Sequence, residues 1–383
     1  MPITTKMSQE KPVKDKNENN ESTNNNNYKT LTQCPYCQGS IIKKGLRKKK
    51  YEDVQIYFCN NCSKKFTSLI TKHKTYPLKV IIGALTLYNK LNTLEEAAEK
   101  VTEKHGIKIT HQTISKWLKE YAQYIPFLRM REFAAKKYSK KEFIEESKLF
   151  HQQIYNFKYH RAKLDLIINE EFRHYRFKPL QEFLELAIAE CPNHIFEKSE
   201  KRASEFKNTF NLDEVRIVPK DNAAVQIANF VIQAVSNNKL RHEALQEFML
   251  ANDTVTIAAE LAVLIGADDI RHFKHELGFD IPITLKDGEY ITGHIDLVQV
   301  RNGSIYIIDF KPSASKEKPI DQLTLYALAL SRLTGIRLYH MKCAWFDESN
   351  YYEFFPLHVV YKLKKNKKKD RYQEKLKRTE SAW

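Results

Sequence analysis

Two acids and a lysine lie close together in the stretch GHIDLVQVRNGSIYIIDFKP, which covers residues 293–312. The acids are Asp296 and Asp309, and the lysine is Lys311. Most of the surrounding residues are apolar, and a charged side chain in such surroundings needs a partner. Two carboxylates held together beside a lysine would suit a divalent cation such as Mg²⁺ or Mn²⁺, which prefers oxygen ligands.

The dipeptide Asn302-Gly303 predicts how this stretch folds. Asn-Gly between two apolar runs is the strongest short signal for a β-hairpin with a type I′ turn. Counting outward from the turn gives the pairs Arg301–Ser304, Val300–Ile305, Val298–Ile307 and Asp296–Asp309. Opposed residues have Cβ atoms roughly 4.5–5.5 Å apart, so like charges repel there. A bound cation would relieve that repulsion, and the alternative is two acids facing solvent on an exposed sheet.

Four of the cysteines form two CxxC pairs, Cys34 with Cys37 and Cys59 with Cys62. Two such pairs predict a structural Zn²⁺ site closed by four thiolates. A redox role for one CxxC is the alternative, which the presence of two matched pairs disfavours. Clustered cysteines also indicate a reducing compartment. The basic and aromatic residues between the pairs suit contact with nucleic acid, although a solvated lysine-rich turn would explain them as well.

The segment 77–124 predicts helices. Thr93 and Glu96 form a capping-box signature, and Gly106 is a helix stop signal. Helix, short turn and helix match the helix-turn-helix layout, in which the second helix enters the major groove of DNA. The residues expected to face the groove are Gln112, Thr113, Ser115 and Lys116. A small helical bundle that does not contact DNA is the alternative.

The chain has 383 residues and a formal net charge of +16, which together allow several domains and favour a polyanionic partner. No apolar run is long enough to span a membrane. We predict a disordered arm (1–30), a zinc ribbon (31–70), a helix-turn-helix (77–124), a helical linker region (125–215), an α/β core (216–361) and a basic tail (362–383). Within the core, 254–265 is rich in β-branched residues and predicts a strand, although its alanines and leucines leave a helix open.

The first part of the chain resembles the DNA-binding region of insertion-sequence transposases and their archaeal relatives. In that pattern a CPxC…CxxC ribbon ends in an aromatic residue and a threonine, here residues 66–67. The helical unit then ends in a Thr-Ile-x-x-Trp helix, here Thr113, Ile114 and Trp117. The resemblance covers roughly residues 31–124 and implies DNA as the partner. The acidic triad of a transposase is not discernible.

The sequences GHID, DFK and QLTLYA resemble the PD-(D/E)XK nuclease superfamily. They are most similar to the branch with RecB-type recombination enzymes and CRISPR-associated exonucleases. That branch has Gly-x-x-Asp on one strand, Asp/Glu-x-Lys on the next and Gln-x-x-x-Tyr on the following helix. The matching positions are Gly293, Asp296, Asp309, Lys311, Gln322 and Tyr326. The resemblance covers roughly residues 221–346 and implies a restriction-endonuclease-like α/β core with a central mixed sheet.

The resemblance also implies a set of metal ligands. His242 lies in a predicted helix upstream of the hairpin, as the upstream histidine of this branch does. With Asp296 and Asp309 it would hold one or two Mg²⁺ or Mn²⁺ ions. Glu260 is a further candidate ligand or support, because some superfamily members use a Glu before the Asp strand.

The remaining residues of the pattern imply the reaction. Lys311 would position or deprotonate the attacking water, and Gln322 and Tyr326, four residues apart on one helix face, would orient the DNA backbone. We therefore expect a Mg²⁺- or Mn²⁺-dependent deoxyribonuclease, delivered to DNA by the zinc ribbon and helix-turn-helix, in the cytoplasm of a prokaryotic-type cell. A non-catalytic DNA-binding regulator, or a transposon-associated protein that retains the nuclease scaffold, is the alternative. An RNA substrate, a homodimer, and the choice between exonuclease and endonuclease stay open.

Overall fold

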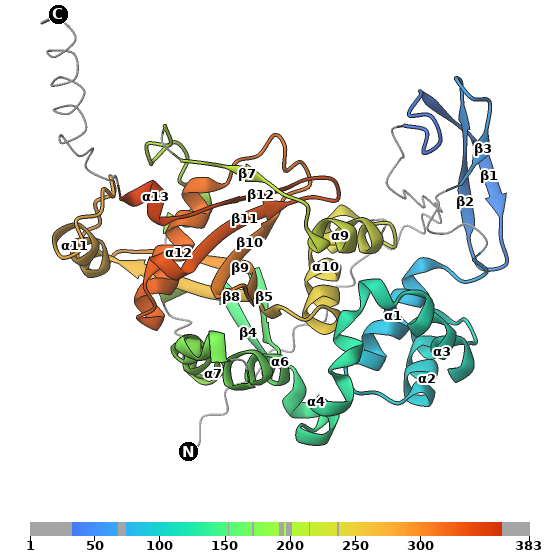
Figure 1. Cartoon of the computed structure of the whole chain (residues 1–383), viewed down its shortest axis with the longest axis horizontal. Helices are drawn as coiled ribbons and strands as arrows, with labels where there is room; N and C mark the ends of the chain where they lie inside the picture. Colours follow the sequence, from blue (N-terminus) through green and yellow to red (C-terminus); the bar gives the residue numbers. More distant parts are fainter. Residues whose placement is uncertain are drawn as a thin grey trace, which may run out of the picture.

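The structure is a computed structural model, and Figure 1 shows its arrangement. It describes residues 33–67, 74–151, 153–170, 172–190, 195–196, 201–213, 215–235 and 237–361. The expected arm over 1–30 and the expected basic tail over 362–383 lie outside the described residues.

The segment with the two CxxC pairs forms a small antiparallel sheet at one end of the molecule (Figure 1). Its strands are β1 (Ile41–Lys48), β2 (Asp53–Cys59) and β3 (Lys65–Phe66), in that order across the sheet. Both CxxC pairs lie in or beside this sheet, and the buried side chains around them include Tyr57 and Phe66. Because this cluster of apolar side chains is small, a bound metal would supply much of the free energy that folds the segment.

Three helices follow, α1 (Leu78–Asn89), α2 (Leu94–His105) and α3 (His111–Glu120). The capping box is present at the start of α2, where the Thr93 side chain accepts from the Glu96 N–H and the Glu96 carboxylate accepts from the Thr93 N–H. Gly106 ends α2 in the left-handed conformation, with φ of 64°. These are the start and stop signals that the sequence carries.

The segment between these helices and the core contains both helices and strands. The helices are η1 (Ala122–Tyr124), η2 (Pro126–Arg129), α4 (Arg131–Lys137), α5 (Lys140–Phe143), α6 (Arg161–Asp165), η3 (Leu166–Glu170), η4 (Phe172–Phe177), α7 (Lys178–Glu190) and η5 (Ala203–Glu205). The strands are β4 (Glu145–His151), β5 (Gln153–Tyr159) and β6 (Lys201–Arg202). The expected helical linker region thus also contributes strands to the main sheet.

The core carries the remaining elements around a nine-stranded mixed sheet with the order β4-β5-β8-β9-β10-β11-β12-β7, in which β6 also pairs with β9. Its strands are β7 (Val218–Pro219), β8 (Thr256–Gly266), β9 (Tyr290–Arg301), β10 (Ser304–Phe310), β11 (Met341–Phe346) and β12 (Tyr351–Phe354). Its helices are α9 (Ala223–Ile232), α10 (Asn238–Asn252), α11 (Ala267–His275), α12 (Ile320–Thr334), η6 (Leu338–His340) and α13 (Leu357–Val360). The open choice at 254–265 is therefore a strand.

Helices cover both faces of this sheet. Apolar residues of α12 and α7 pack against one face, and those of α9 and α10 pack against the other. Successive residues of β10 divide between the two faces, with Ile307 on the α12 side and Ile308 on the α10 side. The apolar residues of α1, α2 and α3 belong to the same buried cluster as those of α9 and α10, so the N-terminal helices share a hydrophobic core with one sheet face.

Among the described residues, the structure contains no helix that is both long and apolar enough to span a membrane.

Candidate functional site

The β9–β10 hairpin has the turn and register that Asn302-Gly303 predicts. Asn302 and Gly303 have φ of 50° and 69°, the positive values that a type I′ turn requires. The pairs Arg301–Ser304, Val300–Ile305 and Val298–Ile307 are all present.

At the far end of the hairpin, Asp296 and Asp309 meet. Both carboxyl groups line the same cavity, and Asp296 Oδ2 accepts a hydrogen bond of 3.0 Å from the Phe310 N–H. Burial and the charge of Asp296 raise the pKa of Asp309 well above its ordinary value. Burial also opposes ionisation of Asp296, but the positive charge of His242 holds the pKa of Asp296 below its ordinary value. Two neighbouring acids, one half-buried and one buried, therefore compete for positive charge.

Lys311 provides one positive charge to this pair. Its Nζ lies 2.8 Å from Asp309 Oδ2, and Asp309 itself is only 3% exposed. The backbone N–H of Lys311 donates to the Phe346 carbonyl at 2.9 Å, which fixes the chain just after β10 against the end of β11. Burial disfavours the charged ammonium, but the Asp309 carboxylate outweighs it and raises the pKa of Lys311.

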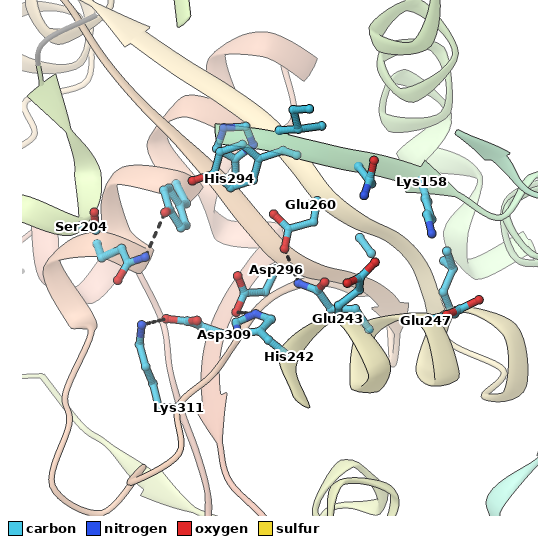
Figure 2. Close-up of a pocket in the computed structure, with 18 of the residues that line it drawn as sticks. Lys158, Ser204, His242, Glu243, Glu247, Glu260, His294, Asp296, Asp309 and Lys311 are labelled. Atoms are coloured by element: carbon cyan, nitrogen blue, oxygen red, sulfur yellow. Dashed lines mark hydrogen bonds and ion pairs between the residues drawn. The ribbon is translucent and has the colours of Figure 1, made fainter. Parts of the chain in front are cut away.

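His242 and Glu260 complete the acidic cluster around Asp296. His242 Nε2 lies 2.7 Å from Asp296 Oδ2, and one donor atom each of His242, Glu260 and Asp296 lie within 4.8 Å of one another. The Asp296 charge raises the pKa of His242 to about 9. Burial, followed by the charge of Asp296, raises the pKa of Glu260 to about 7. An imidazole and two carboxylates in this arrangement fit a Mg²⁺ or Mn²⁺ ion, with Asp309 beside the group (Figure 2).

The backbone of β8 is distorted where it presents Glu260. Glu260 has φ of 54°, which for a non-glycine residue costs ~1–3 kcal/mol and is typical of functional sites. Ala259 packs on the α10 side of the sheet and Leu261 on the α12 side, although residues two apart in a regular strand share a face. The strand therefore reverses its faces at Glu260. The carboxylate is held by Gln246, whose Nε2 donates to Glu260 Oε1 at 2.6 Å.

Helix α12 brings Gln322 and Tyr326 to the same site. Gln322 Nε2 donates to the Tyr326 hydroxyl at 2.9 Å, as their spacing of four residues permits. The Tyr326 ring lies directly against Gly293 of β9, with room for no side chain between them. The pattern residues on β9, β10 and α12 are thus gathered at one place.

Helix α10, which carries His242, is anchored at its C-terminal end by buried polar contacts. Asn89 of α1 donates to Asn252 Oδ1 at 2.8 Å, and both side chains are fully buried. Lys163 of α6 is also fully buried and donates to the Leu250 carbonyl at 2.6 Å. Desolvation lowers the pKa of Lys163 to about 8. The free carbonyls at a helix end need such donors, so α1 and α6 together fix α10 against the sheet.

These groups surround a cavity of about 540 Å³. Figure 2 shows Asp296 between His242 and Glu260, Asp309 beside Lys311, and His294 and Lys158 farther along the same hollow. Ligand sites in proteins commonly have volumes of roughly 300–1,000 Å³, so this cavity is large enough to hold a ligand.

A family model describes the part of the chain that holds this site. Residues 217–380 match the model of the PD-(D/E)XK nuclease superfamily. This segment is a PD-(D/E)XK nuclease superfamily domain. The comparisons with curated proteins and with solved structures each gave no match. Every residue that the sequence pattern selected around the acids lies within the nuclease domain, and the mixed α/β architecture fits a restriction-endonuclease-like core.

The four N-terminal cysteines are also brought together, outside the nuclease domain. The four Sγ atoms all lie within 4.8 Å of one another. The Sγ atoms of Cys34 and Cys62 are 3.6 Å apart, and those of Cys37 and Cys59 are 3.4 Å apart. The backbone N–H of Cys62 helps to lower the pKa of Cys59 to about 6, which favours a thiolate. This donor set is consistent with a zinc ribbon.

In α3 the structure places two of the four expected groove-facing residues, Gln112 and Lys116, at the surface. Thr113 and Ser115 are half-buried, and the Thr113 hydroxyl lies 3.0 Å from the Thr110 hydroxyl. Trp117 on the opposite side is buried in the shared core. The polar face of α3 is thus directed away from the core.

Some residues of the site were not selected from the sequence. Gln246 stands four residues after His242 on the same helix, so its position relative to His242 was available as a signal. Tyr155, Lys158 and Arg202 also line the cavity, from β5 and β6. They lie outside the segment 217–380, and nothing local to them indicates that the chain returns to the nuclease domain.

Proposed function

We propose that the nuclease domain hydrolyses phosphodiester bonds in DNA with Mg²⁺ or Mn²⁺ as its cofactor. The observation that carries this proposal is the group of donor atoms from His242, Glu260 and Asp296 within 4.8 Å of one another, beside the Asp309–Lys311 ion pair. Solvated surface acids rarely converge in a cavity, beside a strained residue and a half-buried lysine that pairs with one of them.

In this proposal the three converging residues and Asp309 together hold the cation. The cation supplies Lewis-acid activation and charge stabilisation at a phosphate oxygen. Lys311, held at 2.8 Å from Asp309, has the position to orient the attacking water and to counter negative charge as it develops. Gln322 and Tyr326 orient the strand that enters the cavity.

The N-terminal segments would deliver this activity to DNA. Support comes from the four clustered cysteines, from the exposed Gln112 and Lys116 on α3, and from the net charge of +16. Because α1 to α3 share a core with the α10 face of the sheet, a duplex bound by α3 would be held in a fixed orientation to the cavity.

The test is a cleavage assay with linear duplex, circular duplex and single-stranded DNA, and with RNA of the same sequence. Each substrate is incubated with Mg²⁺, Mn²⁺ or EDTA, and the Asp309→Asn variant is the control. We expect metal-dependent cleavage of DNA by the wild type alone. Degradation restricted to linear molecules identifies an exonuclease. Failure to cut any substrate favours a DNA-binding regulator.

A further inference from the structure

Part of the cavity wall is built by residues that precede the nuclease domain. Strand β5 pairs with β8, with Lys158 opposite Ala259, and so lies beside the strand that presents Glu260. Strand β6 pairs with β9, with Arg202 opposite Thr292. The two added strands therefore flank the two strands that carry the metal-binding acids, and they bring new side chains to the cavity.

An aromatic pair lies in this wall, two residues along β9 from Asp296. The rings of Tyr155 and His294 are stacked, with centroids 3.6 Å apart and an angle of 3° between their planes. Arg202 Nη2 donates to the Tyr155 hydroxyl at 2.6 Å. His294 is only 5% exposed, whereas Tyr155 is half-buried and lines the cavity. The inner ring thus supports the outer one, and an arginine fixes its edge.

An exposed apolar residue adjoins this platform. Ile154, the neighbour of Tyr155 on β5, is 65% exposed and also lines the cavity. Apolar side chains beside an aromatic ring at a nucleic-acid site can insert between bases and unstack them. Lys158, farther along the same strand and on the same hollow, supplies a positive charge for a phosphate.

We infer that Tyr155, supported by His294 and Arg202, stacks on an unpaired nucleobase next to the scissile phosphate. This inference rests on the proposed nuclease function and names its substrate class: a nucleic-acid strand that presents an unpaired nucleotide, as a single strand or a frayed end does. An aromatic ring supported in this way, with a guanidinium at its edge, can stack on the π face of any base. Base pairs inside a continuous duplex do not expose this face.

The first experiment measures stacking without cleavage. Short single-stranded oligonucleotides carrying 2-aminopurine at successive positions are bound in EDTA, because the fluorescence of this base is quenched when it stacks. The variants are Tyr155→Leu, which fills space without a ring, and Tyr155→Phe, which keeps the ring. The matched control is Tyr339→Leu, because Tyr339 is 72% exposed and precedes the end of β11 that is remote from Asp309. Melting curves confirm that each variant folds.

We expect one position to be quenched by the wild type, Tyr155→Phe and Tyr339→Leu, and not by Tyr155→Leu. The affinity of Tyr155→Leu for the single strand should be about tenfold weaker. Equal quenching by Tyr155→Leu and the wild type overturns the inference.

The second experiment repeats the comparison with Mg²⁺, using a single strand, a blunt duplex and a duplex with a frayed end. The wild type should cut the first and third faster than the second, and Tyr155→Leu should lose this preference. If DNA is cleaved but the fluorescence quenching does not depend on Tyr155, the stacking inference is overturned and the nuclease function stands. Quenching that depends on Tyr155, without cleavage of any substrate, supports stacking and overturns the nuclease function.

Discussion

Gly293 of β9 lies directly against the ring of Tyr326 of α12, so closely that a Cβ at Gly293 would stand 2.2 Å from Tyr326 Cε1. The contact joins two parts of the nuclease pattern that are far apart in the chain. It explains why a glycine precedes Asp296 by three residues: the strand and the helix can approach only if this position has no side chain. The same approach places the Tyr326 hydroxyl and Gln322 at the cavity.

Gly293→Ala should therefore lower both stability and activity. The added methyl group must displace a ring that is 95% buried or the strand that carries Asp296, and overpacking of this kind costs about 1–3 kcal/mol. The control is Gly83→Ala in α1, where the nearest atom to an added Cβ is 3.7 Å away and alanine favours the helix. Chemical denaturation and cleavage rates measure both variants. Equal effects of the two substitutions would contradict the packing argument.

Asp309→Asn should abolish cleavage while binding of DNA persists. Loss of a group that only orients a metal ligand already reduces metal affinity or activity by roughly 10–100-fold. We therefore expect the cleavage rate of Asp309→Asn to fall by more than about a hundredfold. Without metal the variant should melt at a higher temperature than the wild type, because one of two neighbouring like charges is removed. Added Mg²⁺ should raise the melting temperature of the wild type and not that of Asp309→Asn, since a ligand stabilises the state that binds it.

Lys311→Met is the comparison for that experiment. Lys311 pairs with Asp309 but is not itself a metal ligand, so its loss should reduce cleavage steeply and leave the Mg²⁺-dependent rise in melting temperature in place. Loss of the Mg²⁺ effect in Lys311→Met, or wild-type cleavage by Asp309→Asn, would refute these assignments.

Cys37→Ser should reduce bound zinc from one ion per chain to none. Cys37 Sγ lies 3.4 Å from Cys59 Sγ within the group of four thiols, and three thiolates hold zinc far less well than four. The matched control is Cys343→Ala, because Cys343 is buried in the nuclease core and its thiol donates to the Leu323 carbonyl at 3.3 Å. Elemental analysis of the purified proteins gives the answer. The same zinc content in all three proteins would rule out this site.

Lys116→Ala should weaken DNA binding and reduce the slope of log affinity against log salt concentration by about one, if Lys116 contacts a phosphate. A changed sequence preference would instead indicate contact with a base. The control is Lys286→Ala, an exposed residue in the loop between α11 and β9, because α11 and α3 lie at opposite ends of the molecule (Figure 1). If Lys116→Ala and Lys286→Ala behave alike, α3 is a plain bundle helix.

The sequence by itself determined the features that depend on neighbouring residues. Asn302-Gly303 specified the turn, and the alternation of strand side chains then specified the register that leads to Asp296 and Asp309. Thr93 and Glu96 specified the start of α2 in the same way. These interactions span only a few residues, so the amino-acid types and their spacing contain the necessary information.

Only the tertiary structure decided which distant segments complete the site. The reversal of β8 at Glu260 has no local signal, because Glu260 takes its positive φ from the packing on both sides of the strand. Tyr155 and His294 are far apart in sequence, and they meet because β5 joins the sheet beside β8. Pairing between strands that are far apart in the sequence depends on the whole sheet and its helices. A β-strand can pair with any free sheet edge, so its own residues do not determine which strand becomes its neighbour.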